Sequence, residues 1–354
     1  HHFAEASSLI GNEKLVGYSI LAGESALAAY AYEEALDHFE RALAAKESDA
    51  MDAQTANILF GIGCSQMGML ERLQFTKAVE SFRKAFDCFV ELGDIARAVA
   101  IAVYPFPHFP GLEGEIAQFV TRALPLVPND SIDAAKLLSR NGRILGIHQA
   151  DPAVARDAFS KALDIARRHA DTVLEIRTLA SATYIDFFQL RYSEAIVTGE
   201  RAIVLAENTE ELDAALTARY WVASSLRDLG DLDGLRAHAI AALPAAEKLR
   251  NRFWLAGVHW LNENVYRLQG EWGPAREASD RGLALSSMDF RLLWTRTLME
   301  REVGNVEESD AYMARLIEVM RLTRPGPAIP EHAVTAAALA IGASISAIGS
   351  NLKI

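Results

Sequence analysis

The sequence predicts an all-α protein, a right-handed α-α superhelix of about eight helix pairs with roughly 40 residues each. Two observations favour this fold class: a set of three small or apolar positions that recurs along the chain, and glycines at a constant distance before it. A third observation is that no segment alternates polar and apolar residues as a half-buried strand does. Because each repeat packs only on its neighbours, one domain covering 1–354 is expected.

The recurring positions fall at offsets 0, 4 and 7, which lie on one face of a helix. In the first set, Ala35 and Ala42 are small and Phe39 is large. Small residues let two helices approach, and the larger one fills the space between units. The eight sets begin at Ala35, Ala78, Ile116, Ala155, Ala195, Leu235, Ala275 and Ser309, so their starts differ by 43, 38, 39, 40, 40, 40 and 34 residues. Each set therefore marks the second helix of one unit.

The glycines mark the turn between the two helices of a unit. Gly230, Gly270 and Gly304 each stand five residues before a set. Glycine is the residue that most readily ends a helix in the left-handed conformation. These positions therefore predict turns.

Prolines predict further helix boundaries. Asp151-Pro152 and Gly273-Pro274 are expected to open second helices, because proline suits the first helical turn. Pro125 and Pro244 fall two residues after the last position of a set, and are expected to bend or end those helices.

Two segments interrupt the pattern. The first, Tyr104–Gly111, has three prolines and predicts a loop near 104–113 inside the third unit. Its aromatic residues form either a contact surface or a plug packed on their own repeat. The second break, Arg324–Pro330, precedes a terminal partial repeat at 331–354. Its apolar stretch Ala333–Ile348 is not a polar cap, so the array is expected to continue beyond it.

Composition and net charge argue against several classes of function. A net charge of −12 argues against direct nucleic-acid contact. Cys64 and Cys88 are too few for a disulfide framework and are expected to be small core residues. No signal peptide or membrane-spanning run of about 20 apolar residues is present, which predicts a cytoplasmic protein without membrane contact.

The residues around the first unit resemble a known family. His1–Ala6, Gly17-Tyr18, Leu21–Ala26 and Tyr32–Phe39 are similar to the sensor region of MalT-like, LuxR-type ATPase transcriptional regulators and related ATPase–cyclase proteins. The resemblance implies a tetratricopeptide-repeat array that follows a nucleotide-binding domain and often precedes a DNA-binding helix-turn-helix. This sequence contains no P-loop and no recognition-helix pattern, so those effector parts lie outside it.

Motifs for catalysis or metal binding are weak. Gly61, Gly63 and Gly68 have the wrong spacing for a dinucleotide loop and fall where a first helix needs small residues. Glu34 and His38 are one helical turn apart but lack a third ligand. We therefore expect no enzymatic activity, no catalytic residues, no cofactor and no metal.

One constellation predicts a binding groove. When the first helices of the last three units are aligned, three aromatic residues coincide, and seven residues later three arginines coincide. Such positions face the concave side of a tetratricopeptide unit. Aromatic rings offer flat apolar area and arginine binds carboxylate or phosphate. With two neighbouring positions added, the predicted groove consists of Tyr184, Tyr220, Arg227, Trp260, Asn264, Arg267, Trp294 and Arg301. In the alternative interpretation, the rings pack between units and the arginines pair with nearby Asp or Glu.

Two functional hypotheses follow. In the first, the chain is a binding and sensing module whose groove receives a peptide, a protein domain or a small effector, as the sensor arm of a signalling ATPase. In the second, the chain is a structural scaffold that self-associates into homo-oligomers through its ends, which the apolar Ala333–Ile348 motivates.

Overall fold

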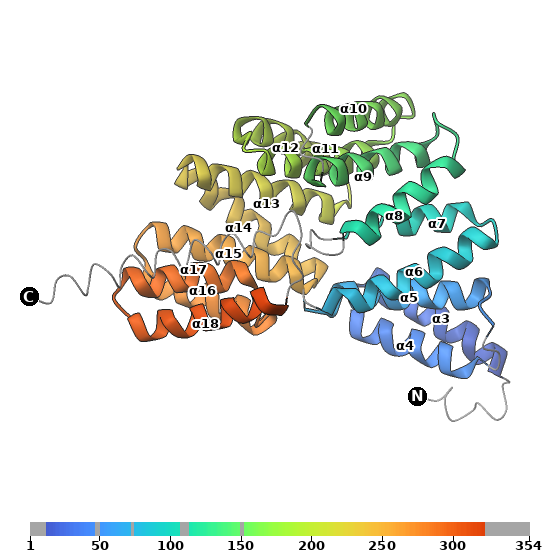
Figure 1. Cartoon of the computed structure of the whole chain (residues 1–354), viewed down its shortest axis with the longest axis horizontal. Coiled ribbons are helices and arrows are strands. Elements are labelled where there is room, and N and C mark those ends of the chain that lie inside the picture. The colour runs from blue at the N-terminus through green and yellow to red at the C-terminus, as the bar shows by residue number, and fades with distance from the viewer. Residues whose placement is uncertain (1–11, 47–49, 72–73, 107–112, 149–151, 323–354) are drawn as a thin grey trace, which may run out of the picture.

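The computed structural model of the chain describes residues 12–46, 50–71, 74–106, 113–148 and 152–322 (Figure 1). Every regular element among them is a helix, and this part of the chain contains no strand. The all-α prediction is therefore confirmed.

Within the described residues the helices follow one another as eight pairs, which is the number that the recurring sets predicted. Successive pairs are α3 (Asn12–Ala28) with α4 (Tyr32–Ala45), α5 (Ala53–Met69) with α6 (Phe75–Glu91), α7 (Ile95–Ala102) with α8 (Glu113–Ala123), α9 (Ile132–His148) with α10 (Pro152–Arg168), α11 (Thr172–Phe188) with α12 (Tyr192–Ala206), α13 (Leu212–Leu229) with α14 (Leu232–Leu249), α15 (Arg252–Leu268) with α16 (Trp272–Leu285), and α17 (Phe290–Glu302) with α18 (Val306–Leu322). A short 3-10 helix, η2 (Leu124–Leu126), follows α8.

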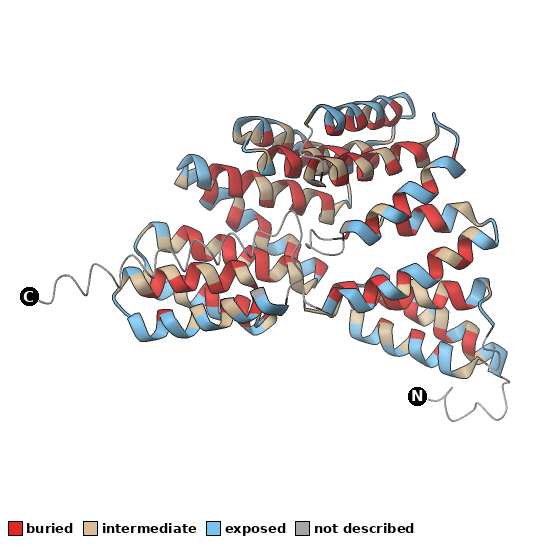
Figure 2. Cartoon of the chain, viewed as in Figure 1, coloured by how far each residue is buried: buried red, intermediate tan, exposed pale blue. Residues whose placement is uncertain are grey.

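The recurring sets lie in the second helix of every pair, where they form the contact with the first helix. All of their residues are buried except Met313, which is half-buried. Figure 2 shows the same division, since the buried residues gather where helices face one another and the outward sides of α4, α10 and α18 are exposed. The approach is close at Gly61, where an added Cβ would lie 2.4 Å from the Phe39 ring. Gly61 is therefore a packing residue of α5 and not part of a nucleotide loop.

The turns within five of the pairs share one backbone conformation. Gly230, Gly270 and Gly304 have φ of 81°, 73° and 86°, as the sequence predicted for helix-ending glycines. Tyr30 and Leu190 occupy the equivalent places in the first and fifth pairs, with φ of 57° and 58°. Side chains disfavour this left-handed region, so those two turns carry backbone strain.

Pro125 and Pro152 stand at helix boundaries as predicted, whereas Pro244 does not end its helix and Pro274 does not open one. Helix α8 ends two residues before Pro125, and α10 begins at Pro152. Pro244, however, lies inside α14, which continues to its full length. This is tolerated because Pro244 is exposed and water can bind the carbonyl that loses its partner. Pro274 is the third residue of α16 and does not open that helix, which begins at Trp272.

The loop after α7 forms a plug and not an exposed surface, as far as it is described. Phe106 is 1% exposed, and its ring centroid lies 5.0 Å from that of Phe82. Tyr104 lies 4.8 Å from the same ring. Of the two alternatives, these contacts favour the plug at Tyr104–Phe106, and burying the rings removes their apolar area from water. The rest of that loop, 107–112, lies outside the described residues.

The stack curves until its second and seventh pairs meet. Figure 1 shows the chain passing from α5 and α6 over α9 to α12 and back to α15, which lies beside α5. At this seam the rings of Phe75 and Phe253 are 6.4 Å apart. The inner side of the curve is therefore enclosed by helices that are far apart in sequence.

Some sequence predictions fall on residues that the structure does not describe. These are the similarity carried by His1–Ala6, the partial repeat at 331–354 and the apolar stretch Ala333–Ile348. Among the described helices, none is long and apolar enough to cross a membrane.

Candidate functional site

The inner side of the superhelix contains a cavity of about 560 Å³. Of the described helices, only first helices line it (α9, α11, α13, α15 and α17), together with Pro105 and Phe106 from the loop after α7. The repeat explains this arrangement, because the second helices use their packing faces against the first helices and lie outside them.

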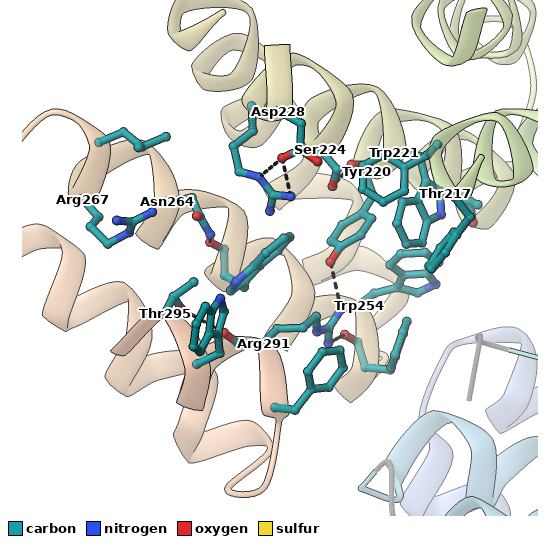
Figure 3. A pocket seen from close by; sticks show the side chains of 18 of the residues that line it. Thr217, Tyr220, Trp221, Ser224, Asp228, Trp254, Asn264, Arg267, Arg291 and Thr295 are labelled. Carbon is teal, nitrogen blue, oxygen red and sulfur yellow. Dashed lines mark hydrogen bonds and ion pairs between the residues drawn. The ribbon is translucent and has the colours of Figure 1, made fainter. Parts of the chain in front are cut away.

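Aromatic rings make up much of the cavity wall. Four of the five tryptophans of the chain line it: Trp221, Trp254, Trp260 and Trp294. The ring of Trp221 packs against three other rings, 4.9 Å from Phe187, 5.2 Å from Phe188 and 5.0 Å from Tyr220. Figure 3 shows Trp221, Tyr220 and Trp254 close together at one end, with Asn264 and Arg267 at the other. Packed rings of this kind present a rigid apolar surface to a ligand.

Six of the eight residues predicted for the groove line this cavity: Tyr220, Arg227, Trp260, Asn264, Arg267 and Trp294. Tyr184 does not line it, because its ring is fully buried against Trp221 and Phe188, at 4.9 and 4.8 Å. Arg301 does not line it either, and its Nη2 pairs with Asp310 at 2.6 Å.

The predicted arginines already have acidic partners. Arg227 donates to Asp228 at 2.7 Å, and its guanidinium lies 4.7 Å from the centre of the Trp260 ring. Arg267 donates to Glu302 at 3.0 Å. These pairs match the alternative interpretation for the arginines, and they leave little uncompensated positive charge at this end of the cavity.

Arg291 is a buried arginine of the cavity wall that the sequence pattern did not single out. Its Nε and Nη2 donate to Asp289 at 2.9 and 2.6 Å, and its Nη1 donates to the hydroxyl of Tyr220 at 3.1 Å. A bidentate pair of this kind fixes the guanidinium plane. Arg291 therefore holds the Tyr220 ring in place, as the dashed line in Figure 3 indicates.

Two further charged residues of the wall were also missed. Arg143 of α9 lies 4.3 Å from the centre of the Tyr184 ring. Asp213, in the first turn of α13, accepts a hydrogen bond from Nε1 of Trp254 at 2.8 Å. Burial raises the pKa of the Asp213 carboxyl, while the Trp254 hydrogen bond and the charge of Arg143 act in the opposite direction.

Asp213 lies where three cavities adjoin. Spaces of about 200 and 120 Å³ flank the main cavity, and all three are lined by Asp213 and Pro105. Arg143 lines the main cavity and the smaller of the two flanking ones. No repeat signal marks this pair, because the curvature of the stack brings α9 and α13 to the same space.

The cavity offers two kinds of surface to a ligand. It combines aromatic stacking area with a few charged groups, the usual composition of a small-ligand site. In the described part of the chain, no group of three or more His, Cys, Asp or Glu side chains could hold a metal ion.

Comparison with protein-family models finds no match for the chain, and a search of curated proteins finds none either. Solved structures do match. The chain is similar to a Rap protein complexed with Competence and Sporulation Factor, at 17% identity and a TM-score of 0.55, over 87% of this chain and 89% of that one. It is also similar to aspartyl phosphate phosphatase F from Bacillus subtilis, at 14% identity and a TM-score of 0.53, over 89% and 96% of the two chains.

A third similar structure is a Signal Transduction ATPase with Numerous Domains from Pyrococcus horikoshii that carries a tetratricopeptide repeat sensor. Identity is 12% and the TM-score 0.55, and the match covers 87% of this chain and 48% of that one, so this chain spans about half of that protein. At such identities the likeness concerns the fold alone. It confirms the predicted tetratricopeptide-like solenoid.

Proposed function

We propose that the chain is a helical-repeat binding and sensing module whose inner cavity receives a peptide segment or a small effector. The convergence of four tryptophans from α13, α15 and α17 on one open cavity is the observation that carries this proposal. Exposing such rings to a cavity leaves apolar area in contact with water, and a ligand stacked on them would remove it.

The size of the cavity limits the occupant. About 560 Å³ falls within the range of roughly 300–1,000 Å³ that small-ligand sites occupy. A folded protein domain does not fit such a space, whereas a short peptide or a metabolite does. A protein partner would therefore have to insert a loop or a terminus.

We further propose that the module serves as the sensor arm of a bacterial signalling ATPase or transcriptional regulator. Two similarities support this: the resemblance of its first unit to MalT-like regulators, and the likeness of its fold to a signalling ATPase with a tetratricopeptide repeat sensor. A protein of similar fold binds Competence and Sporulation Factor, which is consistent with ligand recognition by such a stack. The nucleotide-binding and DNA-binding parts would lie in flanking sequence.

A fluorescence titration tests the binding role. The chain is titrated with a pooled library of free synthetic peptides of two to six residues and with a panel of sugars and nucleotides, and the tryptophan emission is recorded. Ligands that shift the emission are then measured against Trp294→Ala, which removes a half-buried ring of the wall, and against Trp272→Ala, which removes the tryptophan of α16 that does not line the cavity.

The expected result is a loss of affinity of about 5- to 150-fold in Trp294→Ala and little change in Trp272→Ala, because stacking on an aromatic ring contributes roughly 1–3 kcal/mol. If no probe shifts the emission, or if both variants bind as tightly as the parent, the cavity is not a ligand site and the proposal is wrong.

A further inference from the structure

We propose that Arg143 and Asp213 are the two polar anchors for a zwitterionic ligand of the amino-acid or short-peptide type. In this arrangement the Arg143 guanidinium binds the ligand carboxylate and the Asp213 carboxylate binds its ammonium group. The inference rests on the proposed function, because it assigns a ligand class to the same cavity.

Arg143 differs from the other arginines of the wall. Arg227, Arg267 and Arg291 each make an ion pair with an aspartate or glutamate. Arg143 makes none within 4.0 Å among the described residues, and its guanidinium lies on the face of the Tyr184 ring instead. Because no Asp or Glu side chain of the described residues pairs with Arg143, its guanidinium N–H donors remain for a carboxylate, which can accept two of them at once.

Asp213 is the matching carboxylate. Its only hydrogen bond within the described part of the chain is the one that Oδ1 accepts from Nε1 of Trp254, and no lysine or arginine pairs with it there. A carboxylate in such surroundings lacks the solvation of bulk water, which the raised pKa of the Asp213 carboxyl reflects. A ligand ammonium group would supply both a counter-charge and hydrogen-bond donors.

Two neighbouring cations are paired with acidic residues of their own. Arg177 donates to both carboxylate oxygens of Glu211, at 2.8 and 2.6 Å. Lys136 donates to Asp133 at 2.9 Å. Arg177 and Lys136 therefore have acidic partners of their own, whereas Arg143 and Asp213 form no ion pair with another described residue.

The walls around the anchors suit an ammonium group with an apolar side chain. Tyr220, Trp221 and Trp254 line the main cavity together with Asp213, and aromatic faces attract cations. The charge pair also discriminates between ligand classes. Asp213 would repel a phosphate dianion and Arg143 would repel a simple amine, whereas a zwitterion satisfies both residues.

Three synthetic dipeptides test the assignment by isothermal titration calorimetry. They are Phe-Phe with both ends free, N-acetyl-Phe-Phe, which lacks the ammonium group, and Phe-Phe-amide, which lacks the carboxylate. We expect the free dipeptide to bind and each blocked form to bind at least tenfold more weakly, since charge-assisted hydrogen bonds are roughly twice as strong as neutral ones.

Two variants test which residue binds the ammonium group of the ligand and which binds its carboxylate. Asp213→Asn keeps an acceptor for Trp254, and should bind the free and the acetylated dipeptide with similar affinity. Arg143→Gln should lose the preference for the free dipeptide over the amide. The matched controls Asp157→Asn and Arg281→Gln change exposed residues of α10 and α16, and should retain both preferences.

The outcomes separate this inference from the proposed function. If all three dipeptides bind equally and Trp294→Ala weakens all of them, the cavity binds ligands and the anchor assignment is wrong. If Asp213→Asn weakens the acetylated dipeptide as much as the free one, Asp213 has only a structural role and the assignment is again wrong. If neither the dipeptides nor any probe of the wider panel binds, both proposals are overturned.

Discussion

Arg252 donates a hydrogen bond from Nη1 to the backbone oxygen of Met69, 183 positions earlier in the chain, at 3.1 Å. The bond joins the start of α15 to the end of α5 and lies beside the contact between Phe75 and Phe253. Phe253 also lines the main cavity. The seam that closes the superhelix and the wall of the candidate site therefore share a residue.

We predict that Arg252→Ala loosens this seam without unfolding the chain. A hydrogen bond from a charged donor contributes about 1.5–3 kcal/mol, and here that contribution is local to the contact between α5 and α15. Hydrogen exchange measured by mass spectrometry should show faster exchange in the facing ends of these two helices. Arg236→Ala, at an exposed position of α14, is the control. Unchanged exchange at the seam would mean that the Phe75–Phe253 contact alone closes it.

Substitutions at two glycines test whether small residues allow the helices of the repeat to pack closely. Gly61→Ala should destabilise the chain by about 1–3 kcal/mol, because its Cβ would lie 2.4 Å from the Phe39 ring. Gly17→Ala, in the middle of α3 with no atom within 4 Å of the added Cβ, should stabilise it by about 0.5–1 kcal/mol. Urea unfolding measures both changes. Effects of the same sign in the two variants would contradict the packing explanation.

Leu190 gives a complementary test at a turn. Its φ is 58° and its side chain is 72% exposed, so it has backbone strain and little burial to offset it. Leu190→Gly should raise the free energy of unfolding by about 0.5–1 kcal/mol, since glycine adopts this conformation without the Cβ penalty. Leu229→Gly, at the exposed last residue of α13, should lower it. Thermal melting of the two variants in parallel distinguishes strain relief from a general effect of losing a leucine.

The length of the repeat could be predicted from the sequence because it follows from local packing. The positions of Ala35, Phe39 and Ala42 within one helix determine which face is buried, and this rule repeats in every unit. Turn glycines were equally readable, since their backbone conformation is a local property. Tyr30 and Leu190 adopt the same conformation without being glycine, so sequence offered no signal for them.

Only part of the candidate site could be predicted from the sequence, and the reason is physical. Tyr220 and Trp260 face inward because of their register in the repeat, which sequence spacing reveals. Arg143 and Asp213 share a cavity because the whole stack curves, and curvature is the sum of small rotations that no single repeat encodes. Tyr184 lies in the same register as cavity residues, yet Trp221 covers it, which depends on the packing of two large rings.

A buried glutamate beside the cavity gives the chain a characteristic pH dependence. Glu263 of α15 is fully buried, and its Oε2 accepts a hydrogen bond from Thr295, a cavity residue, at 2.7 Å. Burial raises the pKa of Glu263 from 4.5 to about 8, although the charges of Arg267 and Arg296 act to lower it. The folded chain thus holds a proton that the unfolded chain releases at lower pH.

The sign of the effect follows from proton linkage. Between about pH 4.5 and 8 the folded state binds the proton of Glu263 and the unfolded state does not, so stability falls as pH rises through this window. The slope from this group is at most about 1.4 kcal/mol per pH unit.

Glu263→Gln removes the titration, and should therefore be more stable than the parent at pH 8, with a difference that shrinks steadily toward pH 5. Urea unfolding at pH 5, 6, 7 and 8 measures it. Glu277→Gln, at an exposed position of α16, is the control. A difference between Glu263→Gln and the parent that stays constant from pH 5 to 8 would show that Glu263 is ionised in the folded chain throughout.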